Sequence, residues 1–139
     1  MLNFKDLEIW RRSHKLTLEI YKATQSFPKE ELFGLTSQTR RAVSSIPTNI
    51  AEGCGRRTNA ELANFLNIAS GSASEVEYEI LLAKDVGYIT AEQCDMWTRE
   101  IGEIRSMLAA YMKRLKADEN SESRNQKSAR SDASLNTEH

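Results

Sequence analysis

The stretch that decides the fold is RRAVSSIPTNIAEG, at residues 40–53. Apolar side chains recur in it at the spacing of one buried helical face, as Ala42, Val43, Ile46, Ile50 and Ala51. Pro47 interrupts the pattern, because it removes a backbone donor and crowds the carbonyl group of Val43, at a cost of roughly 3 kcal/mol inside a helix. Since the apolar positions keep their register beyond Pro47, we predict one kinked helix. The alternative is that Pro47 ends one helix and a second begins.

Four helical segments account for most of the chain, and strand patterns are absent. They cover about residues 6–26, 35–54, 58–87 and 90–116. Thr36 or Ser37 is a candidate cap of the second segment, and TNAE at 58–61 and TAEQ at 90–93 have the capping-box pattern. The short linkers favour antiparallel neighbours, so the predicted fold is all-α, an up-down-up-down four-helix bundle over residues 1–117. Residues 118–139 are mostly polar, with Leu135 as their only large apolar residue, and we predict a disordered tail there.

The composition argues against several classes of protein. The formal net charge is −1, so any nucleic-acid role must come from the distribution of charge. Cys54 and Cys94 lack CxxC spacing and are expected to be reduced core residues. The N-terminus carries charges where a signal peptide needs an unbroken apolar stretch. No run approaches the ~20 apolar residues of a membrane span. We therefore expect a soluble, cytoplasmic protein with no membrane partner.

The first helix carries more apolar surface than one bundle position needs. One stripe consists of Leu7, Trp10, His14, Thr17, Leu18 and Tyr21, and a second consists of Ile9, Leu16, Ile20, Ala23 and Phe27. A surplus stripe suggests that another protomer covers it. We assign the oligomer interface to Ile9, Leu16, Ile20 and Phe27. The alternative is a first helix buried unusually deeply in its own bundle.

Charge gathers at one end of the predicted bundle. Alternating helices bring together the start of the first, the end of the second, the start of the third and the end of the fourth. The candidate phosphate-binding residues there are Arg11, Arg12, Lys15, Arg56, Arg57, Lys113 and Arg114. The start of the third helix also favours an anion. The alternative is structural, because cations stabilise a helix C-terminus and Arg56 can pair with Glu52.

Catalytic chemistry is missing from the sequence. A di-iron bundle needs Glu-x-x-His pairs, and neither His14 nor His139 follows a Glu at that spacing. Glu75 and Glu79 lie one turn apart, and we expect them to pair with Arg40 or Arg41. Ser44 and Ser45 are expected to satisfy carbonyl groups freed by Pro47, since no base is nearby. The sequence predicts a non-enzyme without metal or cofactor.

Three strings carry a family resemblance: residues 40–57, GSASEVE at 71–77 and AKDVGYI at 83–89. They resemble the bacterial four helix bundle proteins, first met as reading frames in intervening sequences of ribosomal RNA genes. The likeness covers about residues 4–115, and LEIWRR at 7–12 also resembles the pattern. Cys54 departs from it, because an aromatic residue is frequent there.

The resemblance implies a cyclic homopentamer. It also implies likeness to the accessory variability determinant of diversity-generating retroelements, a basic pentamer that binds nucleic acid and a reverse transcriptase. The expected function is therefore a non-enzymatic homopentamer that binds RNA or DNA through its basic end. The alternative is an adaptor that docks a reverse transcriptase or another enzyme without touching nucleic acid.

Overall fold

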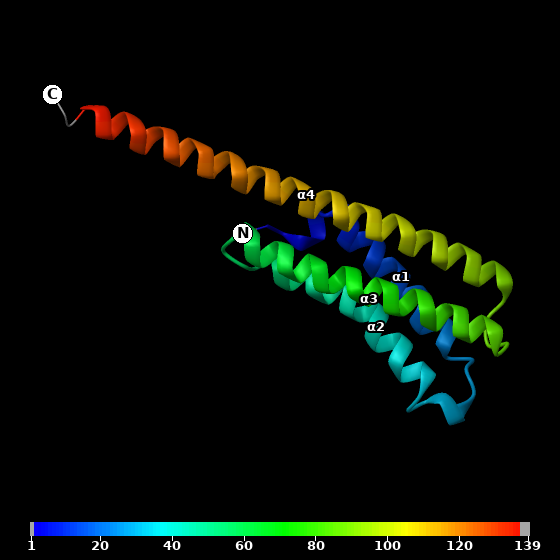
Figure 1. The fold of residues 1–139 in the computed structure, drawn as a ribbon. Coiled ribbons are helices and arrows are strands. Elements are labelled where there is room, and N and C mark those ends of the chain that lie inside the picture. The colour runs from blue at the N-terminus through cyan, green and yellow to red at the C-terminus, as the bar shows by residue number, and fades with distance from the viewer. Residues whose placement is uncertain (1, 137–139) are drawn as a thin grey trace.

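The computed structural model describes residues 2–136, which are helical apart from short connections and contain no strand (Figure 1). The all-α fold expected from the sequence is therefore confirmed. The main helices are α1 (Glu8–Thr24), α2 (Leu35–Cys54), α3 (Asn59–Asp85) and α4 (Ala91–Asn136), with short 3₁₀ turns η1 (Phe4–Asp6) and η2 (Lys29–Glu31). No described helix combines the length and apolarity needed to cross a membrane.

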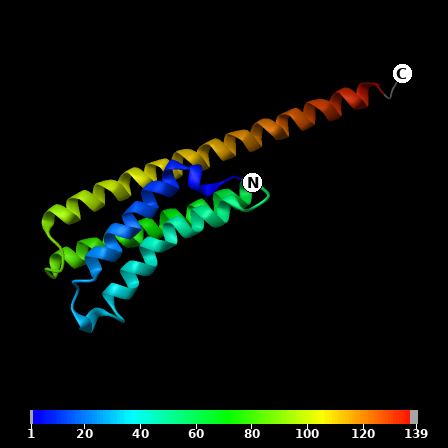
Figure 2. The ribbon, with the colours of Figure 1, turned by 180° about the vertical axis from the view of Figure 1, so that it is seen from behind.

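Successive helices run antiparallel and enclose one apolar core. The N-terminus and the α2–α3 connection lie at one end, and the α1–α2 and α3–α4 connections lie at the other (Figures 1 and 2). Val43, Ile46, Leu66, Ile101 and Ile104 are fully buried at its centre. Between α1 and α4 a groove lined by Leu16, Met96 and Trp97 stays open. The up-down-up-down prediction is correct.

Local capping chemistry sets the starts of α3 and α4. Thr58 accepts a hydrogen bond from the backbone of Glu61 at 3.1 Å, and the Glu61 carboxylate accepts one from the backbone of Thr58 at 3.4 Å. Thr90 and Gln93 exchange the equivalent bonds at 3.0 and 2.9 Å. Both predicted capping boxes are confirmed.

The predicted caps of α2 are wrong. That helix begins at Leu35, whose backbone N–H donates to the Glu31 carboxylate at 3.0 Å, so the cap comes from the preceding turn.

Helix α2 continues through Pro47 from Leu35 to Cys54, so the alternative of two separate helices is wrong. The carbonyl group that Pro47 leaves without its helical donor is that of Val43. The hydroxyl of Thr17, on α1, lies 3.2 Å from that oxygen. The expected role of Ser44 and Ser45 is therefore also wrong. Ser44 donates to the Arg41 carbonyl oxygen, and Ser45 contacts Ser72 on α3.

The interface assigned to α1 requires correction. Ile9, Leu16, Ile20 and Phe27 lie in the core of the single chain, with exposed fractions of 4%, 1%, 1% and 9%. Part of the other stripe of α1 is left in solvent, because Leu18 keeps 57% and Tyr21 keeps 41% of its surface exposed, whereas Thr17 of that stripe is buried. Both stripes are apolar, so a helical wheel alone does not say which one faces the core.

The expected disordered tail is instead helical as far as Asn136. Residues 118–134 are exposed, so no core holds this extension in place. The physical reason is propagation: the bundle has already formed the start of α4, and the extension contains no Gly or Pro to stop it. We call residues 118–136 the α4 extension. It projects beyond the end of the bundle that holds the N-terminus (Figure 1).

Candidate nucleic-acid interface

The end of the bundle that holds the N-terminus collects exposed cations from four segments. The turn η1, the start of α1, the α2–α3 connection and the part of α4 before the extension meet there (Figure 1). We call this surface the basic end. Its exposed basic residues are Lys5, Arg11, Arg56, Arg57, Lys113, Arg114 and Lys116. Most of the predicted cations are therefore found at this end of the bundle. They differ in how strongly other groups of the same chain already bind them.

Arg56 is held by neighbours of its own chain. Its guanidinium bonds to the Glu52 carboxylate at 2.9 Å and lies over the Phe65 ring, 4.8 Å from its centroid. This is the structural alternative considered for that residue. Arg56 therefore keeps only part of its charge available to a phosphate.

Arg57 faces carboxylates that the sequence analysis had not placed. With Thr58 and Ala60 it lines a shallow depression at the start of α3, and Glu119 and Glu122 of the α4 extension line the same depression. Two acidic residues beside Arg57 weaken the local attraction for an anion. The side of the basic end next to Arg57 is therefore less attractive to an anion than its other sides.

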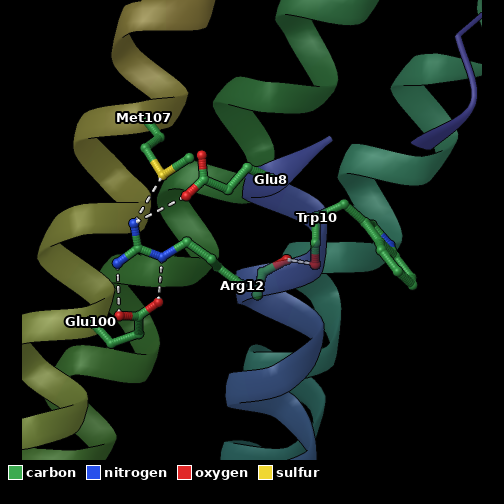
Figure 3. Close-up of polar contacts among 6 residues, drawn as sticks. Glu8, Trp10, Arg12, Glu100 and Met107 are labelled. Carbon is green, nitrogen blue, oxygen red and sulfur yellow. Dashed lines mark hydrogen bonds and ion pairs between the residues drawn. The ribbon is translucent and has the colours of Figure 1, made fainter. Parts of the chain in front are cut away.

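Arg12, in the first turns of α1, connects α1 to α4. Its guanidinium donates to both Glu100 carboxylate oxygens at 2.8 and 2.9 Å, as Figure 3 shows. Further contacts run to the Met107 sulfur at 3.5 Å and to Glu8 at 3.9 Å. The hydrogen bond from Arg12 is the main cause of the lowered pKa of Glu100. Arg12 therefore has a structural role, and its guanidinium is less available to a phosphate than an unpaired cation would be.

The remaining predicted cations differ in setting. Lys15 borders the groove between α1 and α4, beside Trp97, whose indole N–H donates to Glu19 at 3.3 Å. Arg11 donates to the Lys5 carbonyl oxygen at 3.1 Å. Arg114 lies over the Tyr111 ring at 5.0 Å, and Lys113 is exposed beside it. Lys113 and Arg114 are the best placed of the predicted residues to meet a phosphate.

The sequence analysis missed three cations on the α4 extension: Arg124, Lys127 and Arg130, all exposed. They were passed over because the segment was expected to be disordered. The signal was present in their spacing of three residues, which places such side chains on neighbouring positions of one helical side.

The acidic pair on α3 does not form the expected ion pairs. Arg40 bonds instead to the Thr24 hydroxyl at 2.8 Å, and Arg41 bonds to Ser37. Glu79 is only 4% exposed, and one of its carboxylate oxygens has no partner among the described residues. Burial, reinforced by Glu75, raises the pKa of Glu79 to about 7. Within residues 2–136 no cluster of acidic, Cys and His side chains could hold a metal ion.

Two apolar surfaces lie outside the core. The first, on α1 and the α1–α2 connection, consists of Leu18, Tyr21, Leu32 and Phe33, and Phe33 is 93% exposed. The second, on α3, consists of Ile68, Tyr78 and Leu81. We call them the Phe33 surface and the Tyr78 surface. Surfaces of this kind often mark contacts with other macromolecules.

Fold and surface define a class, a small antiparallel helical bundle with a basic end. Residues 5–110 match the family model described as 23S rRNA-intervening sequence protein, and the chain belongs to this family. The chain also resembles a crystal structure of a protein of unknown function from the S23 ribosomal protein family of Bacteroides thetaiotaomicron VPI-5482. The two share 30% identity with a TM-score of 0.68, over 76% of this chain and 98% of that one. No curated protein matches the chain.

Proposed function

We propose that this protein is a non-enzymatic, cytoplasmic homo-oligomer that binds nucleic acid, with RNA as its partner, through the basic end. The observation that carries the proposal is the set of exposed cations from four segments at one end of a chain whose net charge is only −1. Phosphate backbones attract such a surface without any need to read sequence. The family name, which refers to an intervening sequence of 23S rRNA, favours RNA over DNA.

The oligomer part of the proposal rests on the two apolar surfaces. A closed ring needs two different surfaces on each copy, so that one copy's first surface meets the next copy's second. The Phe33 surface and the Tyr78 surface lie on different helices and meet this requirement. The family resemblance suggests five copies. In a ring of this kind the basic ends of all copies point the same way, which multiplies the attraction for a polyanion.

A copurification experiment tests the nucleic-acid part. The full chain is purified from its own cells with and without nuclease treatment, and bound nucleic acid is measured by absorbance and sequenced. We expect ribonuclease-sensitive material of mixed sequence to accompany the protein. Preparations free of nucleic acid at low salt would contradict the proposal.

A second candidate function is an adaptor that docks a reverse transcriptase or another enzyme. The specific observation that favours it is Phe33, which no part of its own chain covers and which borders a hollow lined by Arg40 and Arg41. The same copurification separates the two candidates, because an adaptor retains its enzyme partner after nuclease treatment.

A further inference from the structure

The charges of the α4 extension are largely, but not completely, separated around the helix. Glu119 and Glu122 lie on the side that faces Arg57 and the α2–α3 connection. Arg124, Lys127 and Arg130 follow at intervals of three residues. Arg124 and Lys127 lie on another side of the helix from these two carboxylates. Arg130 is eleven residues beyond Glu119, so it lies nearly in line with that carboxylate, at the edge of the cationic side.

The same stripe of cations begins on the bundle itself. Lys113 and Arg124 are eleven residues apart, as are Lys116 and Lys127, and eleven residues make about three helical turns. Each pair therefore lies almost in line along the axis. At ~100° per residue all five cations, Arg130 included, fall within an arc of about 120°. The positions between them on this arc include Asn120 and Ser123 and no acidic residue.

These cations are free to meet a ligand. All five are exposed, and none forms an ion pair with another described residue. From Lys113 to Arg130 the helix rises about 25 Å at 1.5 Å per residue. The result is a positively charged side of the helix that starts at the basic end and runs outward along α4.

We propose that Lys113, Lys116, Arg124, Lys127 and Arg130 form a stripe that lies along the phosphate backbone of a nucleic-acid duplex. The proposal rests on the proposed function and names the site and form of its ligand. Most of the stripe belongs to the α4 extension, and all of it lies beyond the family-matched residues 5–110.

The chemistry of the stripe favours a duplex over a single strand. Single-strand binders combine cations with aromatic side chains on which unpaired bases stack. No aromatic residue occurs after Tyr111, so the stripe offers charge without a stacking surface. It also lacks the apolar face with which a basic helix enters a membrane surface. Charges spread along one side of a rigid helix suit the regularly spaced phosphates of a duplex.

The test compares two triple variants with the same change in charge. The first is Arg124→Gln, Lys127→Gln and Arg130→Gln, which keeps helix propensity because Gln is a good helix former. The matched control is Lys22→Gln, Lys29→Gln and Lys84→Gln, which removes three cations from the opposite end of the bundle. Circular dichroism and thermal melting confirm that both variants fold. Each is titrated by fluorescence anisotropy against a labelled 20-base-pair duplex and a single strand of the same length.

For duplex binding the slope of log K against log salt changes by about 0.9 for each lost phosphate contact. We expect the stripe variant to lose up to about 2.7 from the slope and on the order of 10²-fold in affinity at about 0.1 M salt. The control should retain wild-type affinity within about threefold, and wild type should prefer duplex to single strand. Equal effects of the two variants, or a preference for single strands, would overturn the stripe while leaving the proposed function intact. No binding by wild type at low salt would overturn both.

Discussion

The Thr17 hydroxyl oxygen lies 3.2 Å from the carbonyl oxygen of Val43, the acceptor that Pro47 deprives of its helical donor. The same hydroxyl lies 2.8 Å from the Ser13 carbonyl oxygen in its own helix, so its hydrogen is shared. Thr17 is only 8% exposed, which keeps water from replacing the bond. A proline inside α2 is therefore tolerated because α1 supplies the missing donor, and this contact ties the two helices together.

Thr17→Val should reduce the free energy of unfolding by about 1–3 kcal/mol, because it leaves the buried Val43 carbonyl group without a donor. In a Pro47→Ala background the helix supplies its own N–H, so the same substitution should cost clearly less. Urea unfolding of the four proteins gives the coupling energy. Thr39→Val is the matched control, since the buried Thr39 hydroxyl has no partner among the described residues. If the effects of Thr17→Val and Pro47→Ala on the free energy of unfolding simply added, the proposed link between Thr17 and Pro47 would be contradicted.

The buried carboxyl group of Glu79 predicts a loss of stability at rising pH. Its pKa in the folded state is about 7, above the unfolded value of about 4.3. The folded state therefore holds a proton that the unfolded state releases, and unfolding becomes easier between about pH 4.3 and 7. Glu79→Gln should be more stable than wild type above pH 7, by on the order of 3 kcal/mol, with the gain vanishing below pH 4. A gain independent of pH would contradict this assignment.

The Arg12–Glu100 pair predicts the opposite trend with pH. The pKa of Glu100 is lowered in the folded state, mainly by the hydrogen bond from Arg12. The pair therefore stabilises the folded protein at pH values above the pKa that Glu100 has in the unfolded chain. This stabilisation is lost as the pH falls through the lower pKa that Glu100 has in the folded protein. Glu100→Gln should cost about 1 kcal/mol at pH 7 and less in acid. Chemical denaturation at pH 7 and pH 3 measures the difference. The control is Asp118→Asn, because Asp118 is an exposed carboxylate on α4 that forms no ion pair with another described residue.

The corrected view of α1 predicts different outcomes for core and surface substitutions. Ile20→Glu places a charge at a site that is 1% exposed, so it should unfold the chain rather than merely separate protomers. Phe33→Glu changes a site that is 93% exposed, so it should preserve the helix content and melting temperature of the single chain while dissociating the proposed ring. Light scattering gives the mass of each variant. An unchanged assembly with Phe33→Glu would remove the Phe33 surface from the proposed ring.

Local signals in the sequence were sufficient for much of the fold. The Thr58 and Thr90 caps could be predicted because their partners lie three residues away. The continuity of α2 followed from apolar register on both sides of Pro47. By contrast, the donor to the Val43 carbonyl group is Thr17 on α1. A helical wheel drawn for α2 alone cannot show a contact with another helix.

The candidate site was harder to predict because it depends on contacts between distant residues. In the sequence Arg12 has the features of a free cation, because its partner Glu100 is 88 positions away. The two apolar stripes of α1 have similar composition, and only packing against α2 and α4 decides which is buried. The α4 extension was misjudged because a composition unable to form a core can still propagate an existing helix.

The central claim, that the basic end binds nucleic acid through its phosphates, is tested most directly by a salt titration of wild type. Anisotropy of two labelled RNA duplexes of unrelated sequence is measured at about 50 and 200 mM salt, with wild type and with Lys113→Gln/Arg114→Gln. We predict equal affinity for both sequences, a fall on the order of 10²-fold across this range, and weaker, less salt-dependent binding by the variant. Absence of binding at about 50 mM salt would contradict the account. So would an affinity that changes neither with salt nor with the substitution of Lys113 and Arg114.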